Sequence, residues 1–97
     1  MRSRFAAYAL GLADYIIHTT DPQGPQWVAD EGVWKASITR FHQSTRFLGL
    51  RVLETGPDTV RFRAELEQLG QDASFEELSR FVQREGRWLY QGRVDPT

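Results

Sequence analysis

The stretch FEELSRFVQREGRWLYQG, Phe75 to Gly92, decides the fold of this chain. Two runs rich in aromatic and β-branched residues flank Glu85-Gly86, and an acidic residue followed by glycine is typical of a tight antiparallel hairpin. A turn at this pair predicts Arg84 opposite Arg87, Gln83 opposite Trp88, Val82 opposite Leu89, and Phe81 opposite Tyr90. One face of the hairpin then carries aromatic rings together with polar groups: Phe75, Glu77, Ser79, Phe81, Gln83, Trp88 and Tyr90. A purely structural core rarely combines such groups, so we expect a pocket on this face.

The strand before this hairpin has the clearest pattern in the sequence. Val60, Phe62, Ala64 and Leu66 alternate with Arg61, Arg63, Glu65 and Glu67, as in a strand with one buried face. A turn at Gly70-Gln71 predicts four cross-strand pairs: Leu66 with Phe75, Ala64 with Glu77, Phe62 with Ser79, and Val60 with Phe81. Residues 74–82 also fit a helix, because Ser74 and Glu77 have capping-box spacing. Their direct continuation into the hairpin favours a strand.

The first 45 residues show a helical period instead. Phe5, Tyr8, Ala9, Leu12 and Ile16 form one apolar stripe. Because Gly11 weakens this helix and Asp14 can cap a new turn, two short helices over about 2–12 and 14–20 are an alternative. Trp27, Trp34, Ile38 and Phe41 form a second stripe, which predicts a helix beginning near Asp30 or Glu31.

From Arg46 the period changes to that of a strand. The run RFLGLRVLE is apolar on both faces, and Gly56-Pro57-Asp58 turns the chain. The predicted class is therefore α+β, with one domain over residues 1–97. Its N-terminal helices pack on a curved antiparallel sheet of about four strands. A cone-shaped sheet closed by helices in this order is the NTF2-like, or cystatin-like, architecture.

Composition excludes several classes of function. The 97 residues have a formal net charge of −1, so no excess of positive charge is available for a nucleic acid. The absence of cysteine excludes disulfides and thiolate zinc sites. Asp14 interrupts the N-terminal apolar run, and no run reaches the length that crosses a bilayer. We expect a cytoplasmic protein that has no membrane partner.

Four blocks of the sequence resemble one known family. They are MRSRFAAYALGLADYIIHTTDP at residues 1–22, RFLGLRVLE at 46–54, ELSRF at 77–81 and GRWLYQG at 86–92. In this order and spacing they resemble the YchJ-like family, whose central NTF2-like domain occurs together with SEC-C zinc motifs. The resemblance implies the NTF2-like fold and a zinc-bearing neighbour, but it implies no established reaction.

The chain departs from that family's pattern at three places. The sequence contains no cysteine-rich SEC-C segment, so either the zinc module is missing from this protein or the sequence is one domain of a longer chain. We expect no cofactor in this chain, with zinc only in such a segment. Thr20-Asp21-Pro22 stands where the family often has His-Pro, which removes any role of that histidine. The family's closing Trp-Tyr-Tyr is here Trp88-Leu89-Tyr90.

The strongest candidate for chemistry is Glu77. On an inner apolar face it is a candidate general base, as carboxylates are in the ketosteroid-isomerase-like members of the superfamily. The structural alternative is a buried ion pair with Arg2 or Arg4 of the first helix, with Ser79 satisfying a remaining donor. We favour the pair of Arg4 and Glu77.

Two other groups of residues invite a functional interpretation. Asp14 and His18 share a helix face and can form a base with its orienting group, although an exposed helix pair is the more common use of that spacing. His42 is expected at the end of the third helix, where a cation interacts favourably with the carbonyl end of the helix dipole.

Scattered histidines and carboxylates predict no metal site. Trp27 and other aromatic residues line either a ligand cavity or plain core.

The predictions converge on one candidate pocket and one candidate interface. The pocket residues are Glu77, Ser79, Phe81, Gln83, Phe62, Trp88, Tyr90, Trp34 and Tyr8. The outer sheet face mixes charge with apolar residues and is a candidate homodimer contact: Arg61, Arg63, Glu65, Glu67, Glu76, Leu78, Arg80, Val82 and Leu89.

Three functions remain open from the sequence. The first is a non-catalytic module that binds a small molecule or a protein partner. The second is a small isomerase-, dehydratase- or hydrolase-like enzyme that uses Glu77 or the Asp14 and His18 pair. The third is a structural dimerisation domain. No nucleophile elbow or phosphate-binding loop is present, which removes the commoner enzyme classes without excluding catalysis, and of the three functions we favour the non-catalytic module.

Overall fold

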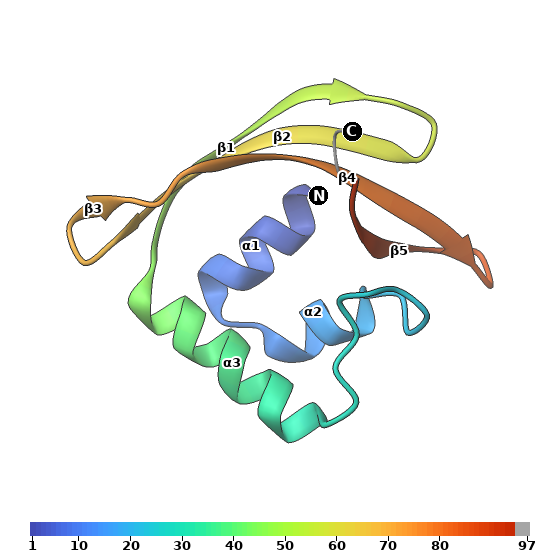
Figure 1. Ribbon diagram of the computed structural model, residues 1–97, viewed down its shortest axis with the longest axis horizontal. Coiled ribbons are helices and arrows are strands. Elements are labelled where there is room, and N and C mark those ends of the chain that lie inside the picture. Colours follow the sequence, from blue (N-terminus) through green and yellow to red (C-terminus); the bar gives the residue numbers. More distant parts are fainter. Residues whose placement is uncertain (95–97) are drawn as a thin grey trace.

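The computed structural model describes residues 1–94 as a curved antiparallel sheet that covers a layer of three helices (Figure 1). The helices are α1 (Arg2–Leu10), α2 (Ala13–His18) and α3 (Glu31–Ser44). The strands are β1 (Arg46–Thr55), β2 (Thr59–Gln68), β3 (Gln71–Asp72), β4 (Phe75–Arg84) and β5 (Arg87–Arg93). The sheet order is β1-β2-β4-β5, and the short β3 pairs with β2. The predicted α+β class, with helices on one face of the sheet, is confirmed.

Local residues explain where each helix begins and ends. Gly11 ends α1 in the left-handed conformation, with φ of 72°, and a Cβ there would lie 2.9 Å from the His42 ring. The first apolar stripe is therefore divided between two short helices, and Leu12 between them is 50% exposed. Asp30 caps α3, because its side chain accepts a hydrogen bond from the Val33 amide at 3.1 Å. The predicted start near Asp30 is confirmed.

The hairpin of β4 and β5 has the predicted register. Glu85 and Gly86 both have positive φ, 52° and 76°, which is the geometry of a type I′ turn. Arg84 pairs with Arg87 and Phe81 with Tyr90. The pairing then shifts between Arg80 and Phe81, so that β5 contains a bulge before Gly92.

The register predicted between β2 and β4 is wrong by two residues. The turn falls at Leu69-Gly70, where φ is 53° and 76°, and not at Gly70-Gln71. The observed pairs are Ala64 with Phe75, Phe62 with Glu77, and Val60 with Ser79. Because side chains alternate with a period of two, a shift of two residues leaves Glu77 and Ser79 on the face that was predicted.

Strand β1 carries two bulges that no sequence pattern signalled. The pairing with β2 skips Leu48 and Leu53, which are 56% and 45% exposed. Each bulge adds one residue to β1 and so shifts the alternation of its side chains by one position. As a result, Phe47 and Leu50, on either side of the first bulge, both face the helices with their partners Leu66 and Ala64. The apolar residues on both faces of this strand therefore result from the bulges.

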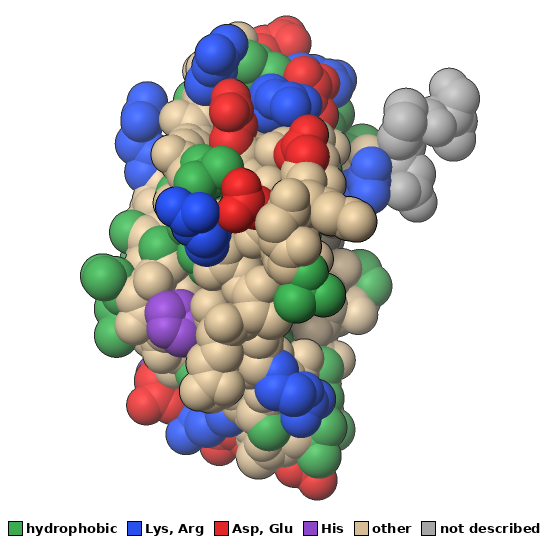
Figure 2. All heavy atoms as spheres, turned by 90° about the vertical axis from the view of Figure 1, so that its left-hand side faces the viewer, with side chains coloured by type: hydrophobic (Ala, Val, Ile, Leu, Met, Phe, Trp, Pro, Cys, Tyr) green, Lys and Arg blue, Asp and Glu red, His purple; other side chains and the backbone are tan. Residues whose placement is uncertain are grey.

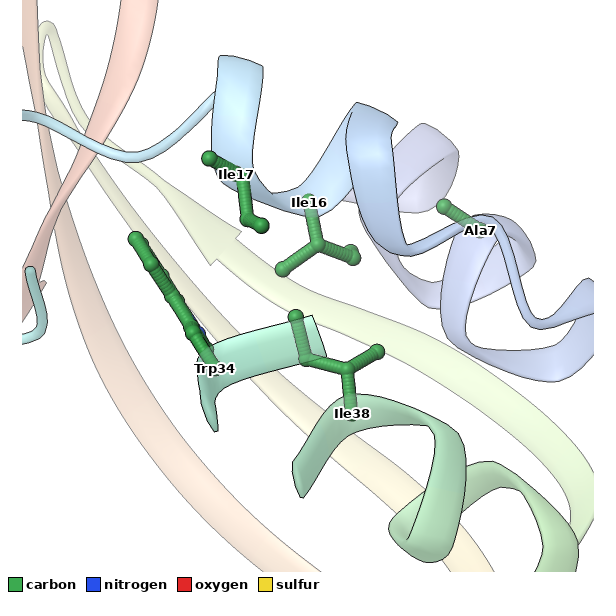
Figure 3. Close-up of a cluster of buried hydrophobic side chains, with 5 residues drawn as sticks. All are labelled: Ala7, Ile16, Ile17, Trp34 and Ile38. Atoms are coloured by element: carbon green, nitrogen blue, oxygen red, sulfur yellow. The ribbon is translucent and has the colours of Figure 1, made fainter. Parts of the chain in front are cut away.

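The core consists of two clusters, one in each layer. Figure 3 shows the helical cluster, in which Ile16 and Ile17 of α2 face Trp34 and Ile38 of α3, with Ala7 of α1 beside them. The sheet cluster is formed by Phe62, Ala64 and Leu66 of β2, all at most 4% exposed. A cavity described below lies between the two layers.

The outer face of the sheet carries charges of both signs. In Figure 2 the basic and acidic side chains are interspersed at the top of the molecule, with single hydrophobic side chains between them. Arg46 pairs with Glu67 at 3.1 Å, while four further pairs on this side of the sheet are looser, at 3.8–3.9 Å. Leu89 is only 8% exposed, so its assignment to an open interface is wrong. A homodimer through this face stays a prediction.

Candidate functional site

A cavity of about 570 Å³ lies between the helices and the concave face of the sheet. This volume is within the range of pockets that hold small molecules. Its walls are mainly apolar, with aromatic rings from Phe5, Tyr8, Trp34, Phe47, Phe62 and Tyr90 among them. The only charged side chains in the lining, within residues 1–94, are those of Arg4 and Glu77. The cavity therefore combines an apolar wall with one acidic and one basic side chain, and Met1, which carries the N-terminal amino group, also lines it.

Glu77 is held at the wall of the cavity by two hydroxyl groups. It lies on β4 opposite Phe62, and its Oε2 atom accepts hydrogen bonds from Ser79 Oγ and, at 2.8 Å, from the Tyr90 hydroxyl. Ser79 is completely buried behind it. Burial, followed by the negative charge of Glu77, raises the pKa of Tyr90, so this phenol remains a donor at neutral pH. Both donors hold the carboxylate through one oxygen.

Arg4 is buried without a carboxylate partner. It is 6% exposed, and its Nη1 atom donates to the Ile16 carbonyl at 3.2 Å, to Thr19 Oγ1 at 2.6 Å and to Thr20 Oγ1 at 3.2 Å. Its Cζ atom lies 4.6 Å from the centre of the Tyr90 ring, which is a cation–π contact. Burial lowers the pKa of Arg4, because desolvation disfavours the charged form.

The predicted ion pair between Arg4 and Glu77 is therefore wrong as a direct contact. Among residues 1–94, Arg4 makes no salt bridge within 4.0 Å, and Tyr90 lies between the two groups, with its ring against Arg4 and its hydroxyl on Glu77. The physical reason is that hydroxyl and carbonyl groups at the end of α2 bind the Nη1 atom of Arg4, and the Tyr90 ring stands between the guanidinium and the carboxylate. Arg2 is exposed and takes no part.

Backbone and side-chain bonds fix the position of Tyr90 from outside the cavity. The Tyr90 amide donates to the Thr19 carbonyl at 2.7 Å, and the Asp21 amide donates to the Tyr90 carbonyl at 2.8 Å. Asp21 has no exposed surface and accepts two bonds from Arg84, at 2.8 and 3.1 Å. This bidentate ion pair lowers the pKa of Asp21 and raises that of Arg84. Asp21 therefore anchors the β4–β5 hairpin to the chain after α2.

The structure brings five of the nine predicted pocket residues to one cavity. Those five are Tyr8, Trp34, Phe62, Glu77 and Tyr90. Phe81 and Trp88 instead line a second hollow of about 330 Å³, which also contains Tyr15 and the turn between β1 and β2. Ser79 is buried behind Glu77, while Gln83 is exposed and lines neither space. Trp27 is 39% exposed and packs edge-on against Trp34 at 5.1 Å.

The pair of Asp14 and His18 is not supported as a catalytic base. Asp14 is exposed and pairs with Lys35 of α3 at 2.8 Å, which lowers the pKa of Asp14. His18 is also exposed. His42 lies in the last turn of α3, as predicted, and donates from Nδ1 to the Tyr8 carbonyl at 2.9 Å. Within residues 1–94, no three histidine or carboxylate side chains lie close enough to hold a metal, and the expected lack of a cofactor stays a prediction.

Most residues of the cavity wall were not among the predicted pocket residues, and Thr20 and Phe47 show why. Thr20 is 2% exposed, accepts a hydrogen bond from Arg4 and lines the cavity, but a threonine after a helix gives no signal of its own. Phe47 points inward because of the neighbouring bulge at Leu48, and a simple alternating pattern does not reveal a bulge. No helix in the described part of the chain is long and apolar enough to cross a membrane.

Three comparisons place the chain among known proteins. A family model described as the YchJ middle NTF2-like domain matches residues 1–92. A UPF0225 protein of Deinococcus radiodurans is 37% identical over 91 residues, which cover 93% of this chain and 62% of the relative. The chain therefore spans about three fifths of that relative's length. The solution structure of RPA3114, a SEC-C motif containing protein from Rhodopseudomonas palustris, has a TM-score of 0.79 and 33% identity, covering 100% of this chain and 76% of that one.

Proposed function

This chain belongs to the family of YchJ middle NTF2-like domains, and from that premise we propose that it is a binding module that holds a small molecule in the cavity between its helices and its sheet. The observation that carries the proposal is the state of Glu77. Its carboxylate lines an aromatic cavity, and two hydroxyl groups hold one of its oxygens. An acceptor positioned in this way on an apolar wall orients a ligand.

The folding stability that is lost by placing Glu77 and Arg4 inside the protein without an ion-pair partner supports the same function. A carboxylate on the inner face of a sheet gives less stability than an apolar side chain of similar size, unless it is fully paired. Glu77 has no arginine or lysine within salt-bridge distance in the described residues. Arg4 likewise is buried without an acidic partner. Residues that reduce stability in this way are concentrated at functional sites.

The direct test is a fragment screen followed by two-dimensional NMR on the parent chain and two variants. Ala64 lies on the cavity wall and is 2% exposed, so Ala64→Leu narrows the cavity. Ala36 lies on the exposed side of α3, so Ala36→Leu makes the same chemical change away from the cavity. We expect fragments to shift resonances of cavity residues in the parent and in Ala36→Leu, and to bind more weakly to Ala64→Leu. Fragments that bind all three proteins equally would contradict the proposal.

A second candidate function is proton transfer by Glu77. It is favoured by the same carboxylate geometry, because a base must be oriented and must have an oxygen within reach of its substrate. Once a ligand is found, the test is exchange of its acidic C–H hydrogens for solvent deuterium. Glu77→Gln is expected to keep binding within about tenfold and to remove the exchange. Exchange that persists in this variant would exclude Glu77 as the base.

A further inference from the structure

The guanidinium of Arg4 keeps two donor atoms after all of its bonds within residues 1–94 are made. Its hydrogen bonds to the Ile16 carbonyl and to the Thr19 and Thr20 hydroxyls all start from Nη1. Nε and Nη2 donate to no group in this part of the chain, although Arg4 is only 6% exposed. Because no fully buried side-chain nitrogen or oxygen there lacks a partner, both atoms retain accessible surface.

The accessible side of Arg4 is the second hollow, of about 330 Å³. This hollow is bounded by the first turn of α1, the end of α2, and the β1–β2 and β4–β5 hairpins, whose turns lie at the same end of the sheet (Figure 1). Arg4 lines both the hollow and the larger cavity. On the cavity side the Tyr90 ring lies against the guanidinium at 4.6 Å, while Thr19 beside Nη1 lines the hollow. A ligand therefore reaches the guanidinium from the hollow.

The charged groups around the hollow leave Arg4 without an acidic partner. Asp58 is the one acidic residue among the described lining residues, and its half-exposed side chain lies 3.8 Å from Arg80. Met1, which carries the N-terminal amino group, also lines the hollow and has the same sign of charge as Arg4. The other polar side chains of the lining are hydroxyl groups, which carry no charge. A buried cation in this position is stabilised by an anion that comes from outside the chain.

The same protein shows which anion fits such an arginine. Arg84 donates from Nε and Nη2 to the two oxygens of Asp21, at 2.8 and 3.1 Å. Nε and Nη2 of Arg4 form the same planar edge, and a carboxylate matches two parallel donors of this kind. A singly charged carboxylate also meets less repulsion from Asp58 than a doubly charged phosphate does.

The remaining wall of the hollow is largely aromatic. Tyr15 of α2, Phe81 of β4 and Trp88 of β5 line it, and Tyr15 and Trp88 are 40% and 53% exposed. Arg87 donates to the His18 carbonyl at 2.9 Å, which holds the hairpin turn beside the end of α2. Exposed aromatic rings around a polar anchor are typical of ligand sites, and a hollow at the lower end of their size range suits a single ring.

The geometry points to a second binding site, in this hollow, for a small aromatic carboxylate. The carboxylate accepts two hydrogen bonds from Nε and Nη2 of Arg4, and the ring of the ligand packs against Tyr15 and Trp88. This inference goes beyond the proposed function, because the ligand of the hollow and the ligand of the larger cavity meet different walls.

The test is a titration of the whole chain with phenylacetate, phenylacetamide, phenyl phosphate and acetate, followed by two-dimensional NMR at neutral pH. We expect phenylacetate to bind about tenfold or more tightly than each of the others. The amide lacks the charge, acetate lacks the ring, and hydrogen bonds between charged groups add at least this much affinity. Phenylacetate is also expected to shift the Nε–H resonance of Arg4 and the indole N–H resonance of Trp88.

Three variants locate the site. Ser3 is an exposed residue of α1 that lines the hollow, so Ser3→Leu narrows it, and we expect phenylacetate to bind about tenfold more weakly. Ala6 is exposed on the same helix and lines neither space, so Ala6→Leu is the control and is expected to bind as the parent does. Arg4→Lys keeps the charge but loses the planar pair of donors, and we expect a loss of about tenfold. Since Ser3→Leu retains Arg4, the test stands even if Arg4→Lys does not fold.

The outcomes keep this inference separate from the proposed function. Equal affinity for phenylacetate and phenylacetamide, or tighter binding of phenyl phosphate, would overturn the carboxylate class. Equal effects of Ser3→Leu and Ala6→Leu would overturn the hollow as the site. Shifts confined to resonances of cavity residues such as Phe62 would also overturn it, and would support a ligand in the larger cavity. Absence of binding by all four compounds would end this inference, while the fragment screen decides the proposed function.

Discussion

At the scale of single residues, Tyr90 connects more of the site than any other side chain. Its ring lies against Arg4, its hydroxyl donates to Glu77, and its backbone pairs with Thr19 and Asp21. A mostly apolar residue with one polar end suits this position between an aromatic wall and a carboxylate. Of these partners, the sequence pattern predicted only that Tyr90 and Glu77 share a face.

Removal of the Tyr90 hydroxyl tests its bond to Glu77. Tyr90→Phe keeps the ring and its contact with Arg4 but takes a donor from a charged acceptor, so we expect a loss of about 1–2 kcal/mol in urea unfolding. Tyr15 is 40% exposed and has no side-chain bond within residues 1–94, so Tyr15→Phe is the matched control and is expected to change stability by less than about 0.5 kcal/mol. Equal effects of the two substitutions would show that the bond to Glu77 contributes nothing.

The bidentate pair of Asp21 and Arg84 gives a pH-dependent prediction. Arg84 lowers the pKa of Asp21 in the folded protein, so this contribution to stability is present above the ordinary aspartate pKa of about 4. It is lost as the pH falls through the lower folded value. We expect the free energy of unfolding below about pH 4 to fall more steeply in the parent chain than in Asp21→Asn. Urea titrations across this range measure the slopes, and parallel slopes would mean that the pKa of Asp21 does not change on folding.

Individual partners were harder to predict than positions on a face. The alternation of apolar and polar residues placed Glu77 and Ser79 on the inner face correctly, because that pattern depends only on the strand period. The partner of Arg4 was not predictable, because the hydroxyl groups it binds follow α2 in the chain. Whether a long side chain reaches a carboxylate or stops at nearer acceptors depends on the tertiary fold.

At the scale of elements, the two hairpin turns show why one register was predicted and the other was not. Glu85-Gly86 has an acidic residue before glycine, a known preference of type I′ turns, and its register is confirmed. Leu69 occupies the equivalent position in the other turn, with φ of 53°, and leucine gives no signal for it. The turn was therefore placed one residue too late, and the strand pairs were displaced by two.

The strain at Leu69 leads to a prediction about this turn. Leucine is disfavoured at positive φ, whereas asparagine followed by glycine is the preferred type I′ pair. Leu69 is 97% exposed, so Leu69→Asn loses little packing, and we expect a gain of about 0.5–1 kcal/mol in urea unfolding. Leu48 is 56% exposed in β1 and has no positive φ, so Leu48→Asn is the control and is expected to give no gain. A gain of the same size from both would mean that removal of an exposed leucine, and not the turn, is responsible.

At the scale of the whole molecule, the two layers differ in how completely they are packed. The helical cluster around Ile16 is closed, while the space between that cluster and β2 forms a cavity of about 570 Å³. Helical stripes and strand alternation predict each apolar face separately. They do not predict the distance between the faces, because the curvature of the sheet depends on bulges such as those at Leu48 and Leu53.

Two alanines with the same burial test this difference between the layers. Ala7 and Ala64 are each 2% exposed, but Ala7 lies within the helical cluster and Ala64 lies on the cavity wall. Ala7→Leu is expected to cost about 1–3 kcal/mol, because it forces extra volume into packed side chains. Ala64→Leu extends into open space and gains apolar contact, so we expect its stability to stay within about 1 kcal/mol of the parent or to rise. Urea unfolding of both variants measures this, and an equal loss would mean that the space beside Ala64 is filled in solution and not available to a ligand.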